Sequence, residues 1–367
     1  MKKTLGIVGA GQLGRMMALA AAPLNIRCVF LDPARDACAS AYGDQLVADY
    51  DDLEAATVLA GQADAATFEF ENVPPSTVAA IAEQIPAYPP ALALATSRDR
   101  WLEKSMFQRL NIPIPPIARV DSQSALVAAV QDIGLPAVLK TRTMGYDGKG
   151  QKVLRHAADL ENAVAELGNV PLILEGFIAF DDELSCVAVR SADGDFKCYD
   201  LVLNEHQDGI LYRSAPQATH SLQGHAADYV KRVMEELQYV GVMAFEFFRL
   251  GDSLMANEIA PRVHNSGHWT IEGAETSQFE NHVRAVCGLP LGDVATRGAV
   301  TMLNVFGGHP DIGGLLRLPG VHWHDYDKAP RPGRKLGHVT VTAADPATLQ
   351  IRVAAAEQCL RNDRGVA

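Results

Sequence analysis

Two apolar segments in the second half of the chain, each interrupted by one glutamate, constrain the fold more than any other feature. Val242–Arg249 and Leu254–Ile259 have the length and apolar character of strands, and a Gly-Asp-Ser turn at residues 251–253 separates them. This pattern predicts an antiparallel β-hairpin. The interrupting residues are Glu246 and Glu258, and apolar strands seldom carry charged groups without a partner.

The register of this hairpin decides whether the two carboxylates face each other. With a three-residue loop, Glu246 lies opposite Glu258 on one face, whereas a two-residue loop places Asn257 opposite Glu246. Facing carboxylates repel each other unless a cation neutralises them. Mg²⁺ is the expected ion, because proteins bind it through one or two carboxylates together with nucleotide phosphates. Outward-facing, solvated glutamates are the alternative.

A polar segment follows the hairpin directly. It includes Arg262, which is predicted to stabilise charge on a transferring phosphoryl or carboxyl group. His264 and His268 lie in the same segment. Histidines at such positions serve structure as often as catalysis, so the sequence leaves both roles open.

A glycine-rich segment with flanking cations follows another predicted strand, Ala137–Lys140. Gly145, Gly148 and Gly150 leave backbone N–H groups free to face phosphate oxygens. The flanking cations are Lys140, Arg142, Lys149 and Lys152. The pattern predicts a lid that closes over a triphosphate and excludes water. A mobile hairpin with a solvated basic face is the alternative.

The N-terminal turn Gly9–Gly14 fits the G-x-G-x-x-G pattern of dinucleotide-binding domains. It follows the predicted strand Thr4–Val8, and Asp32 ends the next strand, where such sites place the acid that binds ribose. Taken alone, the segment predicts NAD or FAD. A tight strand–helix turn without a ligand also fits, and the other motifs of the chain favour it.

The length and the pattern of apolar segments predict several domains. At 367 residues the chain exceeds one ordinary hydrophobic core, and its beginning alternates strands and helices as parallel α/β domains do. We expect domains at residues 1–95, 96–295 and 296–367, with a lid at about 120–180. Ser97 is the predicted N-cap of the first helix after the boundary.

Composition limits the partners and the location. The net charge of −12 argues against nucleic acid as a main partner, because phosphate binding favours a basic surface. No apolar run reaches the roughly 20 residues of a membrane helix, so no membrane association is expected. The six cysteines are scattered without a C-x-x-C pair, which indicates reduced thiols in the cytoplasm.

These motifs together resemble the ATP-grasp superfamily, and longer stretches are similar to its N5-carboxyaminoimidazole ribonucleotide synthetase family. The stretches are residues 68–73, 146–151, 257–270, 277–285 and 331–338. They extend from the N-terminal domain nearly to the C-terminus, so the resemblance covers almost the whole chain. It implies an α/β and α+β chain, in which a Rossmann-like parallel α/β domain precedes the ATP-grasp fold and a small β-rich domain follows it.

The resemblance also implies a reaction. ATP, bicarbonate and 5-aminoimidazole ribonucleotide would give N5-carboxyaminoimidazole ribonucleotide, ADP and phosphate in purine biosynthesis, through carboxyphosphate. The expected cofactors are ATP and Mg²⁺, without NAD or FAD, and the expected assembly is a homodimer.

Individual roles follow from the same resemblance. The residues implied to bind ATP are Arg100, Lys140, Gly145, Tyr146, Asp147, Gly148, Lys149, Gly150, Gln151, Glu175, Gly176, Phe177, Ile178, Glu183, His206, Asn257 and Glu258. Those implied to surround the aminoimidazole ribonucleotide are Tyr146, Asp147, Lys149, Asn265, Ser266, His268, Lys328, Arg334 and Lys335. Glu246 and Glu258 would bind the metal, and the catalytic residues would be Lys140, Arg262 and His268.

The chain departs from the family pattern at two places. Leu203 stands where a glutamate is usual, and Asp327 stands where the family often has glycine. Three other functions fit parts of the sequence. These are a formate-dependent glycinamide ribonucleotide transformylase, an NAD-dependent Rossmann oxidoreductase, and a nucleotide-binding regulator without turnover.

Overall fold

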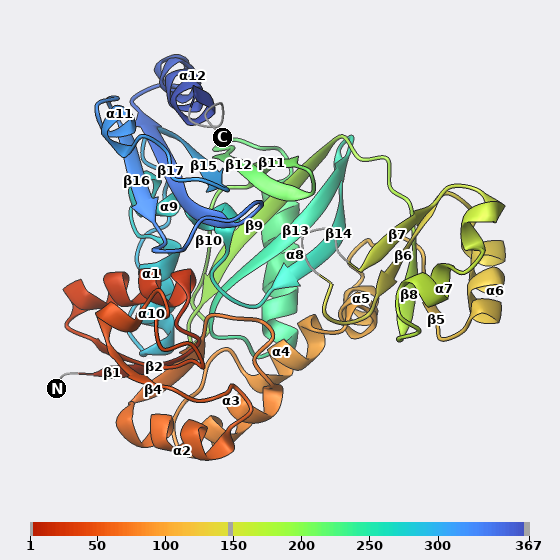
Figure 1. Cartoon of the computed structure of the whole chain (residues 1–367), viewed down its shortest axis with the longest axis horizontal. Helices are drawn as coiled ribbons and strands as arrows, with labels where there is room; N and C mark the ends of the chain where they lie inside the picture. Colours follow the sequence, from red (N-terminus) through yellow and green to blue (C-terminus); the bar gives the residue numbers. More distant parts are fainter. Residues whose placement is uncertain (1–2, 146–149, 363–367) are drawn as a thin grey trace.

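The N-terminal domain is a parallel sheet with helices on both faces (Figure 1). The computed structural model describes residues 3–145 and 150–362 of the chain. The strand order in this sheet is β3-β2-β1-β4. Its strands are β1 (Thr4–Val8), β2 (Arg27–Leu31), β3 (Asp44–Leu46) and β4 (Ala65–Phe68). Its helices are α1 (Gln12–Ala21), α2 (Leu53–Gln62), α3 (Pro75–Ala82) and α4 (Ala91–Ser97), with short 3₁₀ turns η1 (Ala22–Leu24) and η2 (Ser40–Tyr42).

The lid is a separate antiparallel sheet with its own core. Its strands are β5 (Ile117–Val120), β6 (Ala137–Thr141), β7 (Gln151–Leu154) and β8 (Leu172–Gly176), in the order β5-β8-β6-β7. The elements packed beside it are α6 (Gln123–Ile133), η3 (Ala157–Leu160) and α7 (Ala163–Glu166). Buried aliphatic residues of the strands and helices form one cluster, so the lid has a core independent of the rest.

A nine-stranded antiparallel sheet occupies the centre of the molecule (Figure 1). Its main order is β14-β13-β9-β11-β12-β15-β17-β16, and β10 pairs with β9. The strands are β9 (Asp182–Arg190), β10 (Phe196–Cys198), β11 (Val202–Gln207), β12 (Ile210–Pro216), β13 (Gly241–Leu250), β14 (Ser253–Ala260), β15 (Ala299–Phe306), β16 (Val321–Asp325) and β17 (Lys335–Ala343).

Helices cover this sheet and join it to the N-terminal domain. They are α5 (Arg100–Arg109), α8 (Gln223–Glu236), η4 (Asn265–Gly267), α9 (Thr270–Gly273), α10 (Gln278–Val286), α11 (Ile312–Leu316) and α12 (Pro346–Asn362). Helix α10 packs between α1 and the large sheet, and residues of all three share one buried core. The first domain is therefore fixed to the sheet by apolar packing.

The C-terminal strands continue the large sheet. Strand β15 pairs with β12, so β15, β16 and β17 extend the sheet that begins at the hairpin. Helix α12 packs on β15 and β17 and closes a small core of its own. The predicted fold class is confirmed, whereas the exact domain boundaries stay predictions.

The hairpin carries its two glutamates opposite each other, but the reasoning from loop length was wrong. Leu250 pairs with Ser253, so the loop has two residues, and yet Glu246 pairs with Glu258. A β-bulge accounts for the difference, because the register shifts after Glu246 and Asn257 is the extra residue. The bulge restores the pairing that a regular ladder would have lost.

The predicted cap at Ser97 is also wrong. Ser97 ends α4, and the helix that follows begins at Arg100 with Asp99 as its N-cap. The Asp99 carboxylate accepts hydrogen bonds from the backbone N–H groups of Trp101 and Leu102. Across residues 3–145 and 150–362, no helix combines the length and the apolar character needed to span a membrane.

Candidate active site

A cavity of about 710 Å³ lies where the N-terminal domain, the lid and the large sheet meet. The N-terminal domain contributes residues after β1 and β4, where parallel α/β sheets commonly bind ligands. The lid contributes β6, β8 and the start of its glycine-rich turn, and the large sheet contributes the hairpin. All three parts of the fold therefore build one site.

Most of the described site residues predicted from the sequence line this cavity. They are Arg100, Lys140, Gly145, Gln151, Glu175, Gly176, Phe177, Ile178, Glu183, His206, Glu246, Asn257, Glu258, Arg262, Asn265 and Lys335. The residues that do not line it are Gly150, Ser266, His268, Lys328 and Arg334. Tyr146, Asp147, Gly148 and Lys149 lie outside the described residues.

The paired glutamates have different electrostatic surroundings. Burial and the neighbouring carboxylate of Glu258 raise the pKa of Glu246 to about 8. Burial alone would also raise the pKa of Glu258, but the charge of Arg100 outweighs burial and holds the pKa of that carboxyl below its ordinary value. Arg100 Nη1 donates to Glu258 Oε2 at 2.7 Å. One carboxylate of the pair is thus already partnered by a cation, and the other favours a proton or a metal ion.

Helix α5 holds the bulge that creates this pair. The Glu103 carboxylate accepts the backbone N–H of Ile259 at 2.8 Å, and Lys104 Nζ donates to the backbone carbonyl of Ala256 at 3.0 Å. These two contacts lie on either side of Asn257 and Glu258. Both charged side chains are buried, so their bonds to the strand backbone keep the irregular register in place.

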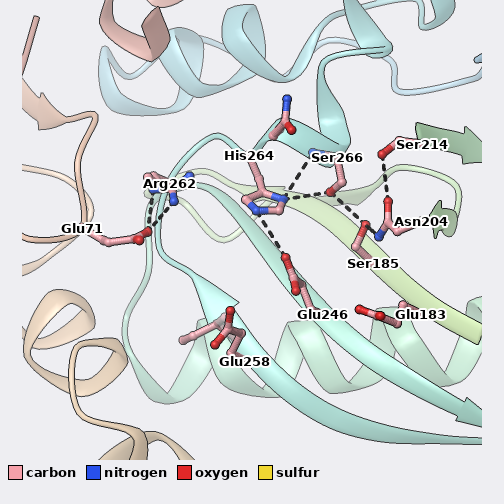
Figure 2. Close-up of polar contacts among 12 residues, drawn as sticks. Glu71, Glu183, Ser185, Asn204, Ser214, Glu246, Glu258, Arg262, His264 and Ser266 are labelled. Atoms are coloured by element: carbon pink, nitrogen blue, oxygen red, sulfur yellow. Dashed lines mark hydrogen bonds and ion pairs between the residues drawn. The ribbon is translucent and has the colours of Figure 1, made fainter. Parts of the chain in front are cut away.

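Two further cations of the cavity are also paired with carboxylates. Lys140 Nζ donates to Glu175 Oε2 at 2.8 Å, and Arg262 Nε donates to Glu71 Oε2 at 2.7 Å (Figure 2 shows the second pair). Burial alone would raise the pKa of Glu175, but Lys104 and Lys140 lower it to about 2. These pairs keep the charges of the cavity fixed and nearly balanced.

One wall of the cavity has the composition of a nucleotide-base site. Strand β8 ends at Gly176, and Phe177 and Ile178 follow beside the half-buried Glu183. Glu183 Oε2 lies 3.3 Å from His206 Nδ1. Burial alone would lower the pKa of His206, but the hydrogen bond and the charge of Glu183 raise it above its ordinary value.

The two histidines of the polar segment occupy different environments. His264 lines the cavity, and its Nε2 lies 3.3 Å from Glu246 Oε1 (Figure 2). His268 is fully buried behind the cavity, where its ring packs against Phe279 and His338. Burial lowers the pKa of both imidazoles well below the ordinary value. Of the two, only His264 has direct access to the site, so the catalytic role predicted for His268 does not agree with its position.

The N-terminal glycine turn is filled by a side chain of the protein. The Glu69 carboxylate accepts hydrogen bonds from the backbone N–H groups of Gly11 at 2.6 Å and Gly14 at 2.8 Å. A Cβ atom at Gly9 or Gly11 would lie 2.5 Å from an atom of Glu69, so the glycines admit this carboxylate. Asp32 accepts from the Ala10 N–H and from the Tyr50 hydroxyl. The acid expected to bind ribose is therefore already engaged.

Three cations of the C-terminal domain, Lys328, Arg334 and Lys335, form a basic cluster, and Lys328 reaches the helix that follows this turn. Lys328 Nζ donates to the side chain of Gln12, and its charge lies over the Tyr326 ring. Lys335 lines the cavity, whereas Arg334 is half-buried outside it and donates to the backbone carbonyl of Ala329. Asp327 has a φ of 55°, a conformation that glycine adopts easily, which explains why the family often has glycine there.

The fold and the cavity define the chain as an ATP-grasp ligase. An ATP-grasp domain model matches residues 105–279, a ribonucleotide synthetase preATP-grasp domain model matches residues 1–98, and a phosphoribosylaminoimidazole carboxylase C-terminal domain model matches residues 300–352. The N5-carboxyaminoimidazole ribonucleotide synthase of Pseudomonas aeruginosa is 57% identical to this chain, and the match covers 96% of this chain and 98% of that protein. The chain belongs to the N5-carboxyaminoimidazole ribonucleotide synthase family.

Solved structures agree with this assignment. The synthetase from Thermus thermophilus has a TM-score of 0.93 and 47% identity, covering 97% of this chain and 98% of that one. The synthase from Aspergillus clavatus, solved in complex with ADP and 5-aminoimidazole ribonucleotide, has a TM-score of 0.90 and 29% identity, covering 98% and 99%. These relatives confirm the family predicted from the sequence and favour neither the formate-dependent transformylase nor the NAD-dependent oxidoreductase.

Several residues of the site were not predicted from the sequence. Glu69 and Glu71 lie directly after the parallel strand β4, and the carboxyl ends of such strands border ligand crevices, so their position was an available signal. Glu103 and Lys104 gave no such signal. They lie on a helix far from the hairpin in the sequence, and only the folded chain brings them to its backbone.

Proposed function

We propose that this chain couples the cleavage of ATP to the carboxylation of 5-aminoimidazole ribonucleotide through carboxyphosphate, using the residues of the shared cavity. The chain is an ATP-dependent carbon–nitrogen ligase of purine biosynthesis that forms N5-carboxyaminoimidazole ribonucleotide. The observation that supports the proposed site best is the Glu246–Glu258 pair, which faces the same cavity as Lys140 and Arg262.

The carboxylate pair fits a Mg²⁺ ion. The donors are two carboxylates on neighbouring strands with an amide between them, and Mg²⁺ is commonly held by one or two carboxylates plus phosphate oxygens. No group of three or more potential ligands occurs in the part of the chain that the structure describes, so phosphates would complete the coordination. Glu246 and Glu258 would hold the ion with Asn257 beside them. When bound, the ion would neutralise negative charge on the ATP phosphates.

The cations of the cavity would act on the transferred phosphoryl group. A bicarbonate oxygen attacks the γ-phosphorus, the bond to ADP breaks, and carboxyphosphate forms. Lys140 and Arg100 would bind phosphate oxygens, and Arg262 would stabilise the charge that develops during the transfer. Because Arg100 and Lys140 are paired with Glu258 and Glu175 before substrates bind, ATP would replace these carboxylates as the partners of the two cations.

The second step transfers the carboxyl group to the amine. The amine nitrogen of 5-aminoimidazole ribonucleotide attacks the carboxyl carbon, phosphate leaves, and the nitrogen loses a proton. Carboxyphosphate hydrolyses readily, so the lid would exclude water during this step. Lys328, Arg334 and Lys335 would bind the 5′-phosphate, because they gather positive charge near the cavity in a chain of net charge −12.

The test is phosphate release measured with and without bicarbonate and 5-aminoimidazole ribonucleotide, in the wild type and in Glu258→Gln. The variant keeps the size of the side chain and removes one charge of the pair, so turnover should fall by about 10²-fold or more. Glu235→Gln is the control, because Glu235 is exposed on α8 and should change nothing. Near-normal turnover in Glu258→Gln at saturating Mg²⁺ would refute the proposed metal site.

The basic cluster has a separate test. Arg334→Ala and Lys335→Ala should each raise the KM for 5-aminoimidazole ribonucleotide by about 10- to 100-fold, while the KM for ATP stays almost unchanged. Equal weakening for both substrates would indicate a structural role instead. We also propose a homodimer in the cytoplasm, on the resemblance alone, and light scattering of the purified protein would test the dimer.

A further inference from the structure

A line of hydrogen bonds runs from the interior of the large sheet to His264, which lies beside the proposed metal-binding carboxylate Glu246 (Figure 2). Ser214 Oγ donates to Asn204 Oδ1 at 2.8 Å, and Asn204 Nδ2 donates to Ser185 Oγ at 2.9 Å. Ser185 Oγ donates to Ser266 Oγ at 2.8 Å. Ser266 Oγ lies 2.9 Å from Nδ1 of His264, whose Nε2 faces Glu246.

These side chains come from three strands and one turn of the sequence. Ser185 lies on β9, Asn204 on β11 and Ser214 on β12, while Ser266 belongs to η4. All four are buried, and their polar atoms bond to one another within the sheet. A buried polar network of this kind is stabilising only when its members are satisfied, so the direction of each bond matters.

The amide of Asn204 sets the direction of the line. Asn204 accepts from Ser214 and donates through Nδ2 to Ser185 Oγ, so the single proton of the Ser185 hydroxyl goes to Ser266 Oγ. The Ser266 hydroxyl then donates to His264 Nδ1 at 2.9 Å, and this nitrogen presents its lone pair. The backbone N–H of Ser266 donates to the same nitrogen over a longer 3.3 Å, which agrees with this direction.

We propose that Ser214, Asn204, Ser185 and Ser266 form a relay that positions His264 as the Nε2–H tautomer, so that its N–H is directed at the Glu246 carboxylate. The imidazole then donates to Oε1 of Glu246 and fixes the orientation of that carboxylate beside Glu258. The relay residues are positioning residues, since they act on the cavity only through His264. The inference rests on the proposed role of Glu246 in holding the metal.

The relay accounts for the orientation of the Glu246 carboxylate, which the reaction alone does not explain. A carboxylate that faces another carboxylate is repelled and would turn away without a donor on its far side. When Glu246 is ionised, as metal binding requires, the opposite tautomer of His264 would present a lone pair to it and add to this repulsion. The orientation of the Glu246 carboxylate therefore depends on proton positions within the sheet, at bonds that are closed to solvent.

The first experiment measures the tautomer directly in the metal-free protein. Nitrogen-15 NMR of the imidazole side chains distinguishes Nε2–H from Nδ1–H, and the signal of His264 is assigned by its loss in His264→Gln. The expected result is the Nε2–H form alone. Observation of the Nδ1–H form in the wild type would overturn the relay without bearing on whether Glu246 holds the metal.

Two variants then test the relay at a distance from the site. Asn204→Asp replaces the donor to Ser185 by an acceptor of equal size, so the protons should reverse and His264 should shift toward Nδ1–H. Ser185→Ala cuts the line while leaving Ser266, His264 and Glu246 intact. The Mg²⁺ concentration for half-maximal activity should rise about 10-fold in Ser185→Ala, with the KM for 5-aminoimidazole ribonucleotide unchanged.

Matched controls separate the relay from a general loss of stability. Asn281→Asp makes the same change at another buried amide, and Ser191→Ala removes a buried hydroxyl just beyond the end of β9. Neither should alter the His264 tautomer or the Mg²⁺ requirement. If Asn204→Asp does not fold, Ser185→Ala decides the matter. An unchanged Mg²⁺ requirement in folded Ser185→Ala, or an equal rise in the KM for the ribonucleotide, would overturn the proposal.

Discussion

The two glycine-rich turns of this chain follow strands in the same way but have opposite surroundings. In the first turn, residues 9–14, the backbone amides are already bonded to the carboxylate of Glu69. In the second, Gly145 and Gln151 line the large cavity together with Lys140. The first turn has the backbone geometry of an anion site, and the glycine spacing of the second predicts one. They differ in whether the protein itself provides the anion.

The comparison shows that a glycine pattern specifies close approach to a negative group without specifying its origin. A carboxylate from β4 and a phosphate from a nucleotide place similar demands on a turn, namely exposed N–H groups and no Cβ. The first turn therefore joins two strands of one domain. Near the second turn, Lys140 and Arg100 are held by carboxylates, and we propose that ATP replaces these partners.

The largest effect is expected at the second turn. Lys140→Met should lower kcat/KM for ATP by about 10²-fold or more, because a charge that acts on the phosphates is lost. The variant should also be less stable, since Glu175 is buried and loses its partner. Adding Glu175→Gln should restore the melting temperature but not the turnover. Recovery of turnover in the double variant would show that Lys140 serves the fold rather than ATP.

The next largest effect is expected at His282, which joins the N-terminal domain, where the first turn lies, to the large sheet. His282 Nδ1 accepts the Val242 N–H at 3.0 Å, and its Nε2 lies 2.8 Å from Thr67 Oγ1 on β4. Burial lowers the pKa of His282 from 6.5 to about 4. The unfolded chain therefore takes up the proton first as the pH falls, and stability that is complete above pH 6.5 is lost toward pH 4. The loss should approach roughly 3 kcal/mol.

Denaturant unfolding between pH 7 and pH 4 measures this loss. His282→Gln retains hydrogen-bonding groups but cannot titrate, so its free energy of unfolding should fall less steeply with pH than that of the wild type. The other buried histidines remain as an internal reference. Parallel pH profiles for the two proteins would contradict the role of His282.

A smaller effect is expected when the internal anion of the first turn is altered. Glu69→Gln keeps one acceptor but places an amide N–H₂ against a backbone donor of the turn. The free energy of unfolding should fall by about 1–3 kcal/mol. Glu83→Gln, at an exposed glutamate after α3, should be silent in the same measurement. An equally small change in both variants would mean that Glu69 does not hold the turn.

The smallest effect is the one that separates the turns most directly. NAD⁺ should not raise the melting temperature, whereas ATP with Mg²⁺ should, because only a ligand of the folded state stabilises it. The purified protein should also lack nicotinamide and flavin absorbance. A saturable rise in melting temperature with NAD⁺ would show that the first turn accepts a dinucleotide despite Glu69.

Local patterns in the sequence determined much of this protein. Alternating strands and helices predicted the parallel first domain, and two apolar segments predicted the hairpin with its glutamates. Longer motifs predicted the family, which the relatives confirm. These signals succeed because backbone periodicity, turn chemistry and short motifs depend on residues that are neighbours along the chain.

Contacts between distant residues decided the rest. The Glu246–Glu258 pair needed a bulge that Glu103 and Lys104 hold from another helix. Both Ser and Asp are good N-cap residues, but α5 is capped by Asp99 and not by Ser97. Asp99 also accepts a hydrogen bond from Arg142. Glu69 fills a turn 55 or more residues away, and His268 is buried behind the site it was expected to join. Burial and long-range hydrogen bonds fix these features, and neither has a signature in local spacing.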